Sequence, residues 1–295
     1  MDIRSQIRNV KRSFFYEVDD LKRIYFTSKK KSEIVNEKEI RVVGLRRSGN
    51  HAIITWIRRH YPEYIYHLNN IPVKQNPYRF LAEHFPKDNL KQEAKGNFTH
   101  KNCLIYSYEN GALENIADPI FEAKHDIYLG KSRTRTDVLI LRDPFNMFAS
   151  MLAGGEKTNS KLRYMRIRKS EKNISQLWLD YAKEFLGETS YLKNNKLVIN
   201  YNKWCLEENY RKQISKQLNL EFSDAGFNIV KNIGGGSSFD GTKFSGESEK
   251  MDLMNRWKKY VDNNQYLQMF DQQIIDYSER ISGHLSGTEL LKIKK

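Results

Sequence analysis

Residues 41–57 decide the fold and read RVVGLRRSGNHAIITWI. The stretch begins as an apolar strand that ends at Gly44, passes through a loop bounded by Gly49, and continues as an apolar helix. Unpaired backbone N–H groups and the positive end of a helix dipole meet at such a turn, so the pattern predicts an anion site. Within the loop, Arg46 and Arg47 add two guanidinium groups that match phosphate or sulfate oxygens.

The loop lacks the residues that a nucleotide-hydrolysing P-loop needs. Gly44 and Gly49 have the spacing of such a loop, but Asn50 and His51 stand where it has a lysine and a serine or threonine. Those two residues normally hold the β- and γ-phosphates and a magnesium ion. The sequence therefore disfavours ATP or GTP hydrolysis and favours an anion site that works without a metal.

Outside this stretch, apolar strands alternate with helices, which indicates an α/β fold with a central parallel sheet flanked by helices. The expected strands cover residues 40–45, 64–67, 103–108, 137–141 and 197–201. The expected helices follow Gly49 and Pro144 and cover residues 174–187, 203–218, 250–261 and 266–281. Mobile loops are expected over residues 156–172 and 232–249.

The composition limits the class of protein. The chain has 295 residues, and 50 Lys and Arg against 36 Asp and Glu give a net charge of +14, which indicates an anionic partner. With 39% hydrophobic residues, a chain of this length folds without disulfide or metal support. Two cysteines, Cys103 and Cys205, exclude a disulfide scaffold and a multi-thiolate metal site.

Residues 1–38 are predicted to form a basic helical arm, and residues 39–295 one α/β domain. The arm carries apolar residues at roughly helical spacing: Ile7, Val10, Phe14, Phe15, Val18, Leu21, Ile24 and Tyr25. A helix packed on the domain is one interpretation, and a helix that contacts a membrane surface or a partner is the other. No stretch of 18 apolar residues and no apolar leader occurs, so we expect a cytoplasmic protein, with a membrane-peripheral position left open.

The loop resembles a known phosphate-binding element. Arg47-Ser48-Gly49 after a strand resembles the 5′-phosphosulfate loop of sulfotransferases that use 3′-phosphoadenosine 5′-phosphosulfate (PAPS). In that family a Lys or Arg-Ser-Gly-Thr-Thr segment binds the 5′-phosphate, and here Asn50 and His51 replace the two threonines. The resemblance implies the P-loop NTPase-like fold of sulfotransferases.

A second element strengthens this resemblance. The expected strand 137–141 ends in Arg142, with Ser150 eight residues later, and this pair is similar to the family's 3′-phosphate site. Helix capping explains the intervening Asp143 and Pro144, but it does not explain an arginine at the carboxyl end of a strand, where such sheets bind ligands.

The resemblance spans about residues 40–260, and it implies a late loop that closes over the cofactor and a tyrosine against the adenine. Residues 72–130 match no element of the family that we can name. The cofactor-binding residues that it implies are Arg46, Arg47, Ser48, Gly49, Asn50, His51, Arg142, Ser150, Tyr201, Ser237, Ser238 and Lys243, with Gly235 and Gly236 in the late loop.

The implied reaction moves a sulfuryl group from PAPS to a hydroxyl or amine and leaves adenosine 3′,5′-bisphosphate (PAP), with no metal. Arg47 is predicted to stabilise the negative charge of the leaving group. Two residues at strand ends are candidates for the general base, His67 and Glu109, and for each an ordinary structural role is also open. His67 is slightly favoured because the usual pKa of histidine, about 6.5, suits base catalysis at neutral pH.

Three further functions stay open on the sequence. A nucleic-acid-binding protein fits the charge and the aromatic–basic stretches at 78–80 and 163–166, but no signature of an RNA- or DNA-binding fold occurs, so no specific nucleic acid is expected. A P-loop kinase and a sulfotransferase-like protein that only binds its ligand are the second and the third. The acceptor is left open among sugar, lipid, small alcohol and peptide, and the seven basic residues in 156–172 would guide an anionic glycan or lipid head group.

Overall fold

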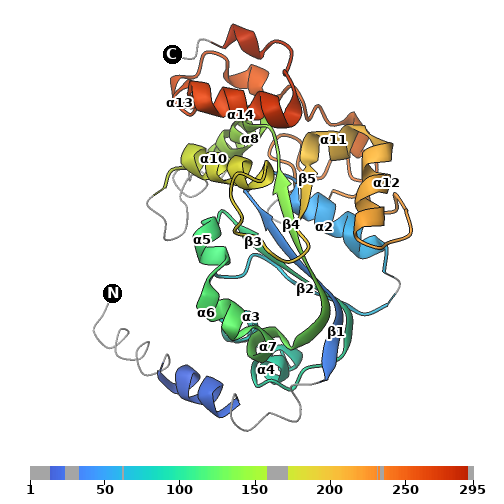
Figure 1. Cartoon of the computed structure of the whole chain (residues 1–295). Helices are drawn as coiled ribbons and strands as arrows, with labels where there is room; N and C mark the ends of the chain where they lie inside the picture. The colour runs from blue at the N-terminus through green and yellow to red at the C-terminus, as the bar shows by residue number, and fades with distance from the viewer. Residues whose placement is uncertain are drawn as a thin grey trace.

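A five-stranded parallel sheet forms the centre of the computed structural model, in the strand order β2-β3-β1-β4-β5 (Figure 1). The structure describes residues 14–23, 33–61, 63–157, 172–230, 232 and 236–291. The prediction of an α/β fold with a central parallel sheet flanked by helices is confirmed. The strands are β1 (Ile34–Gly44), β2 (Ile65–Leu68), β3 (Lys101–Glu109), β4 (Lys131–Leu141) and β5 (Leu197–Asn200).

Strand β1 lies in the middle of the sheet and is buried on both faces. Val42 belongs to one hydrophobic core and its neighbour Val43 to the other, and neither is exposed to solvent. A parallel strand covered on both faces needs such a continuous apolar run. In the register, Gly44 at the end of β1 faces Glu109 on β3 and Ile140 on β4, so the carboxyl ends of the three strands lie together.

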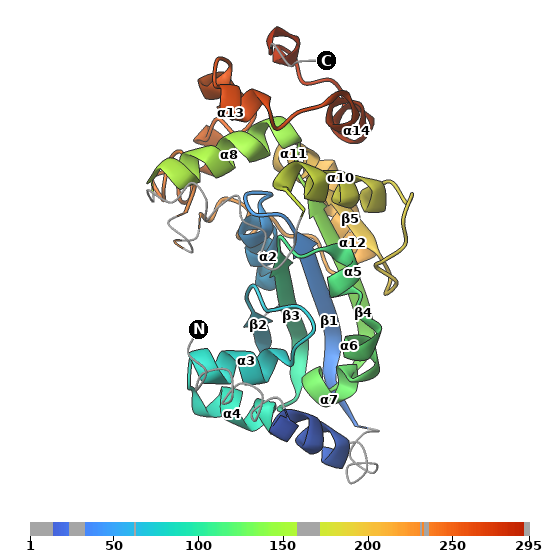
Figure 2. The same cartoon turned by 90° about the vertical axis from the view of Figure 1, so that its left-hand side faces the viewer.

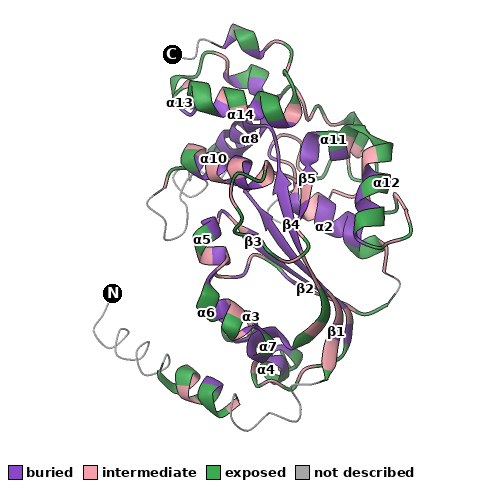
Figure 3. Cartoon of the chain, viewed as in Figure 1, coloured by how far each residue is buried: buried purple, intermediate pink, exposed green. Residues whose placement is uncertain are grey.

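Helices cover both faces of the sheet, as Figures 1 and 2 show, and their inward sides are buried (Figure 3). One face carries α2 (Asn50–Arg59), α11 (Tyr201–Leu206) and α12 (Glu208–Gln217). The other core takes side chains from α3 (Pro77–His84), α4 (Asp88–Ala94), α5 (Leu113–Ile116), α6 (Pro119–Ala123), α7 (His125–Leu129), α8 (Pro144–Lys157), α10 (Ile174–Phe185), α13 (Asn264–Leu267) and α14 (Gln272–Ser282).

Three predicted helices were wrong in detail. The helix expected over 203–218 is divided into α11 and α12, because Glu207 between them is extended. The stretch 266–281 is divided into α13 and α14, because the side chain of Asp271 caps a new helix at the backbone N–H of Ile274. Residues 250–261 form no α-helix but short 3₁₀ turns, η3 (Ser248–Lys250) and η4 (Arg256–Tyr260), and a further turn, η5 (Thr288–Leu290), lies near the end of the chain.

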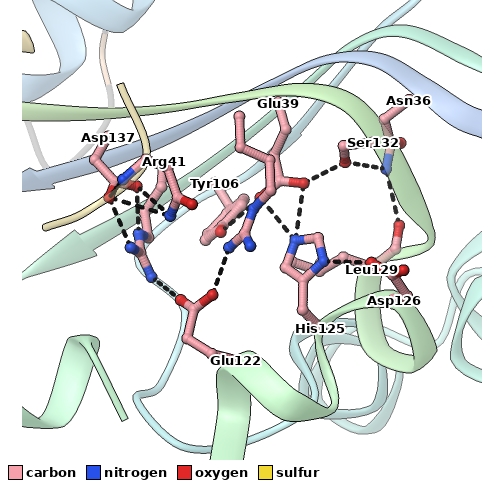
Figure 4. Close-up of polar contacts among 12 residues, drawn as sticks. Asn36, Glu39, Arg41, Tyr106, Glu122, His125, Asp126, Leu129, Ser132 and Asp137 are labelled. Carbon is pink, nitrogen blue, oxygen red and sulfur yellow. Dashed lines mark hydrogen bonds and ion pairs between the residues drawn. The ribbon is translucent and has the colours of Figure 1, made fainter. Parts of the chain in front are cut away.

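Strands β1 and β4 begin six residues earlier than predicted, because their first halves carry a buried polar network in place of apolar alternation (Figure 4). Arg135 on β4 forms an ion pair of 3.2 Å with Glu39 on β1, and both residues precede the predicted strand starts. His125 forms a 2.8 Å ion pair with Glu39. Burial opposes ionisation of both partners, but the His125 charge lowers the pKa of Glu39 to about 2, and the Glu39 charge raises the pKa of His125 to about 9.

Residues 14–23 form a helix that packs on the domain. Its Asp20 forms an ion pair of 2.6 Å with Arg79 and accepts a 3.1 Å hydrogen bond from the hydroxyl of Tyr128. Strand β1 begins at Ile34, within the predicted arm, and the boundary at residue 38 stays a prediction. At the loop expected over 156–172, α8 continues to Lys157. The rest of this expected loop, up to residue 171, lies outside the described residues.

None of the helices in the described part of the chain has the length and apolar character that crossing a bilayer requires.

Candidate functional site

A cavity of about 390 Å³ lies at the carboxyl ends of β1, β3 and β4. After β1 the chain passes to α2 on one face of the sheet, whereas after β4 it passes to α8 on the other. Ligands of parallel α/β sheets bind in the crevice where neighbouring connections leave in opposite directions. The lining of the cavity in this protein includes the β1–α2 loop, Glu109, Arg142, α11 and a late segment that ends at Arg256.

The loop after β1 is held in a tight turn that starts α2 at the cavity. Arg47 and Gly49 have positive φ angles of 67° and 87°. The backbone N–H of Ser48 donates to the carbonyl of Leu45 at 3.2 Å, and Ala52 donates to the carbonyl of Gly49 at 3.0 Å as the helix begins. The first N–H groups of a helix have no partner within it, so the start of α2 presents donors to a ligand.

Glycine is required at position 49 for two reasons. Its φ of 87° is one that residues with a side chain rarely adopt, and a Cβ there would lie 2.0 Å from the ring of Tyr201. The tyrosine ring therefore packs directly on the loop. Asn50 braces the same loop from inside, because its side-chain amide donates to the carbonyl of Leu45 at 3.0 Å and to Glu109 at 3.4 Å.

Two buried arginines share one serine at the side of the cavity next to the loop. Arg142 donates to Ser150 Oγ at 3.4 Å and to the carbonyl of Arg47 at 3.2 Å. Arg256 donates to the same Ser150 oxygen at 3.1 Å and to Ser237 Oγ at 2.9 Å. Burial, and then the charge of Arg142, lowers the pKa of Arg256 to about 10. Asp240 lies 3.3 Å from the Arg256 guanidinium and offsets part of this positive charge. Two like charges in a desolvated place still favour an anion beside them.

The Nε atoms of Arg142 and Arg256 support this interpretation. Both atoms are buried and lack a hydrogen-bond partner among the residues that the structure describes. Ser238 lines the cavity, and its buried hydroxyl also lacks a hydrogen-bond partner among the described residues. Buried polar groups usually have partners, so donors of this kind beside a cavity fit a ligand rich in oxygen atoms.

Arg256 is a site residue that the sequence analysis missed. It lies in a stretch predicted as an α-helix, and no motif marks it. The 3₁₀ turn η4 begins at Arg256, and Asn146 on α8 accepts a 2.8 Å hydrogen bond from its backbone N–H. In the sequence, Arg256 is marked only by its positive charge, which it shares with many other residues.

An aromatic and apolar wall lines the cavity beside Arg142. Tyr201 stacks on Trp204 with ring centroids 5.9 Å apart, and the Arg142 guanidinium lies 5.3 Å from the centre of the Tyr201 ring. Burial raises the pKa of Tyr201 well above its usual value, so the phenol stays neutral. Other apolar lining residues are Phe227, Ile229, Val230, Met251, Leu253 and Met254, which sequence reasoning also missed. Such a wall suits a flat heterocyclic ring.

The late loop contacts the first loop. The guanidinium of Arg47 donates to the carbonyl of Gly236 at 3.1 Å. Ser237 and Ser238 line the cavity, whereas Lys243 does not belong to its described lining and lies with its ammonium 5.1 Å from the ring of Phe244. Gly235 lies outside the described residues.

The two candidate bases occupy different environments. Glu109 lines the cavity, with Arg46 Nε at 3.7 Å and His51 Nδ1 at 3.8 Å from its carboxylate. His67 is not part of the described lining, because it lies on the edge strand β2. Burial, followed by the charge of Arg58, lowers the pKa of His67 to about 3, which makes it a weak proton acceptor at neutral pH.

The structure thus brings most of the predicted residues to one cavity. Those that line it are Arg47, Gly49, Asn50, His51, Glu109, Arg142, Tyr201, Ser237 and Ser238. Three more lie just behind: Ser48, whose hydroxyl contacts Met147, Ser150 beneath the two arginines, and Arg46 against Glu109.

No protein-family model matches the chain, and a search of curated proteins finds no match. Among solved structures, the chain is similar to the crystal structure of mouse sulfotransferase SULT7A1 complexed with PAP. The two are 16% identical, the match covers 68% of this chain and 67% of that chain, and the TM-score is 0.38. What the cavity binds is therefore inferred from its own residues.

Proposed function

We propose that this protein is a PAPS-dependent sulfotransferase that transfers a sulfuryl group to a hydroxyl or amine of its acceptor. The observation that carries the proposal is the presence of two cationic groups on one cavity. One is the β1–α2 loop with Arg47, and the other is the pair Arg142 and Arg256 around Ser150. Tyr201 contacts both, because its ring packs on Gly49 and beside Arg142.

This arrangement supports a nucleotide with phosphate groups at two separate positions of the ribose. A nucleoside triphosphate carries its charge in one chain and needs a lysine and a metal-binding hydroxyl at the loop. Here Asn50 turns back onto the loop, and His51 forms a 3.1 Å hydrogen bond with Asn69 and lies beside Glu109. Neither residue supplies what a kinase requires.

The residues around the cavity have different proposed roles, according to which end of the nucleotide they would contact. When bound, PAPS supplies a sulfuryl group on a phosphosulfate linkage. Arg47 and the start of α2 hold the 5′ end, and the Arg47 guanidinium stabilises negative charge there. Arg142, Ser150 and Arg256 hold the 3′-phosphate, and the aromatic wall holds the adenine.

Glu109 is the proposed general base. Its carboxylate lies on the cavity, next to the loop, where the acceptor hydroxyl must approach the 5′ end of the nucleotide. Asn50, Arg46 and His51 fix its orientation through the contacts given above, so it is held ready to accept the acceptor proton.

The test incubates the purified chain with PAPS labelled with sulfur-35 and a mixture of alcohols, phenols, sugars and amines, and follows the label. Transfer without added metal, lost in Arg47→Ala, is the expected result. Phosphate transfer from ATP with magnesium, without sulfur transfer, would assign the protein to the kinases instead.

A further inference from the structure

The helix of residues 14–23 contacts the domain with its polar face. Tyr16, Asp20 and Arg23 are spaced by four and three residues, so they lie on one side of the helix. The hydroxyl of Tyr16 contacts Glu83, Asp20 pairs with Arg79, and Arg23 donates to the carbonyl of Ile127 at 2.5 Å. These are hydrogen bonds and ion pairs, where a helix on a soluble domain usually buries apolar side chains.

The opposite face of the helix is apolar and exposed to solvent. Phe14, Leu21 and the half-buried Val18 share this face, since they too are spaced by four and three residues. Phe14 and Phe15 are each 67% exposed and Leu21 is 53% exposed. The amphipathic pattern is therefore inverted, and a face of this kind requires a partner outside the described domain.

The acidic residues of the helix are neutralised by the domain. Glu17 accepts a 2.7 Å hydrogen bond from Lys124, and Asp19 forms an ion pair of 2.5 Å with Arg79. The helix therefore presents little net negative charge on its outer side. On each side of it the sequence is basic: residues 1–13 and 24–32 together contain seven Lys and Arg and a single acidic residue.

We propose that residues 14–23 dock this protein on an anionic lipid bilayer. An apolar helix face flanked by clustered Lys and Arg is the combination that inserts into the headgroup region and is attracted to acidic lipids. Two more exposed hydrophobic side chains lie close in sequence to residues that contact this helix, Phe85 after α3 and Ile120 on α6, at 60% and 66% exposure.

Docking by this face leaves the cavity turned away from the bilayer. Figures 1 and 2 show the helix beside α4 and α7, at the end of the sheet where β1 begins, and the cavity lies where β1 ends. The eleven residues of β1 span about 35 Å between the two ends. The bilayer therefore localises the protein without covering its site, and this inference does not rest on the proposed reaction.

The test is co-sedimentation of the full chain with lipid vesicles. Vesicles of phosphatidylcholine with about one-third phosphatidylserine are compared with phosphatidylcholine alone. We expect binding to the acidic vesicles that is at least about tenfold stronger and that weakens at high salt. The double variant Phe14→Ser and Leu21→Ser should lose it, whereas the control Tyr191→Ser, at another exposed aromatic residue, should keep it.

Both test variants change exposed side chains, so their thermal unfolding midpoints should equal that of the wild type. Absence of binding to acidic vesicles by the wild-type chain overturns the proposal, as does equal binding by the double variant. If sedimentation equilibrium instead shows a dimer that the double variant abolishes, a second copy of the chain covers this face, and the lipid proposal fails.

Discussion

Replacing Arg256 tests the assignment of the second phosphate position. Arg256→Met keeps the apolar stem and removes the guanidinium that donates to Ser150 at 3.1 Å and to Ser237 at 2.9 Å. The variant leaves Arg142 as the remaining cation on Ser150, and it removes a guanidinium whose pKa is lowered by burial and then by the charge of Arg142. It also ends the 3.3 Å ion pair with the partly exposed Asp240, so we expect a stability close to that of the wild type.

The expected effect depends on whether the ligand carries a 3′-phosphate. A hydrogen bond to a charged group contributes about 1.5–3 kcal/mol, which corresponds to a roughly 10- to 150-fold change in affinity. PAP should lose affinity by that factor. Adenosine 5′-monophosphate lacks the 3′-phosphate, so its affinity should change by less than about threefold.

Isothermal titration calorimetry of both ligands on both proteins gives the four dissociation constants. The ratio of the two losses isolates the interaction between Arg256 and the 3′-phosphate from any general damage to the cavity. Equal losses for the two ligands would refute the reasoning, because Arg256 would then shape the cavity without contacting that phosphate. An unchanged affinity for PAP would refute it as well.

Three further predictions concern the base, the loop and the buried network. Glu109→Gln removes the proposed base, so it should lower the rate of sulfuryl transfer about 10²- to 10⁴-fold while the dissociation constant of PAP stays within about twofold. A large loss of PAP affinity would instead make Glu109 a binding residue. Gly49→Ala should lower the free energy of unfolding in urea by about 1–3 kcal/mol, because the new Cβ meets the Tyr201 ring at 2.0 Å. The control Gly187→Ala has a similar φ of 78° but no atom within 4 Å of its new Cβ, so it should lower the free energy of unfolding by less. Equal losses in the two variants would argue against packing of Tyr201 on the loop. His125→Gln should lower the free energy of unfolding by about 1–3 kcal/mol at pH 6, since it removes one of the two cations that pair with buried Glu39 and leaves Arg135 at 3.2 Å as the other. The exposed control His284→Gln should not lower it. The folded pKa of His125, about 9, lies above its ordinary value of 6.5, so the stability from this pair is complete below pH 6.5 and is lost as the pH rises through 9. The difference between wild type and His125→Gln should therefore shrink at pH 10, and a difference that grows with pH would contradict this account.

The local parts of the site were predictable from the sequence. The loop at residues 46–51, the pair Arg142 and Ser150, and Tyr201 each follow or end a strand with a clear apolar pattern, and the carboxyl ends of parallel strands meet at one edge. Arg256 was not predictable in this way, because it reaches the cavity only through a 3₁₀ turn that packs on α8.

The order of the strands is the reason why Glu109, and not His67, is the proposed base. His67 and Glu109 both lie at or near strand ends, and the sequence does not say which of the two strands lies beside β1. In the sheet, β3 pairs with β1 and places Glu109 opposite Gly44, whereas β2 lies one strand further out at the edge. The early halves of β1 and β4 were missed for a different reason, since the ion-paired side chains of Glu39 and Arg135 do not alternate as apolar strands do.

The most direct test of the central claim compares PAP with adenosine 5′-diphosphate by calorimetry in the absence of metal. The two ligands are isomers that contain the same adenosine and two phosphate groups, and they differ in where the second phosphate is attached. With Arg142 and Arg256 around Ser150 as the second phosphate position, PAP should bind about 100-fold more tightly. Equal affinities, or tighter binding of the diphosphate, would contradict the proposal that this cavity holds the sulfotransferase cofactor.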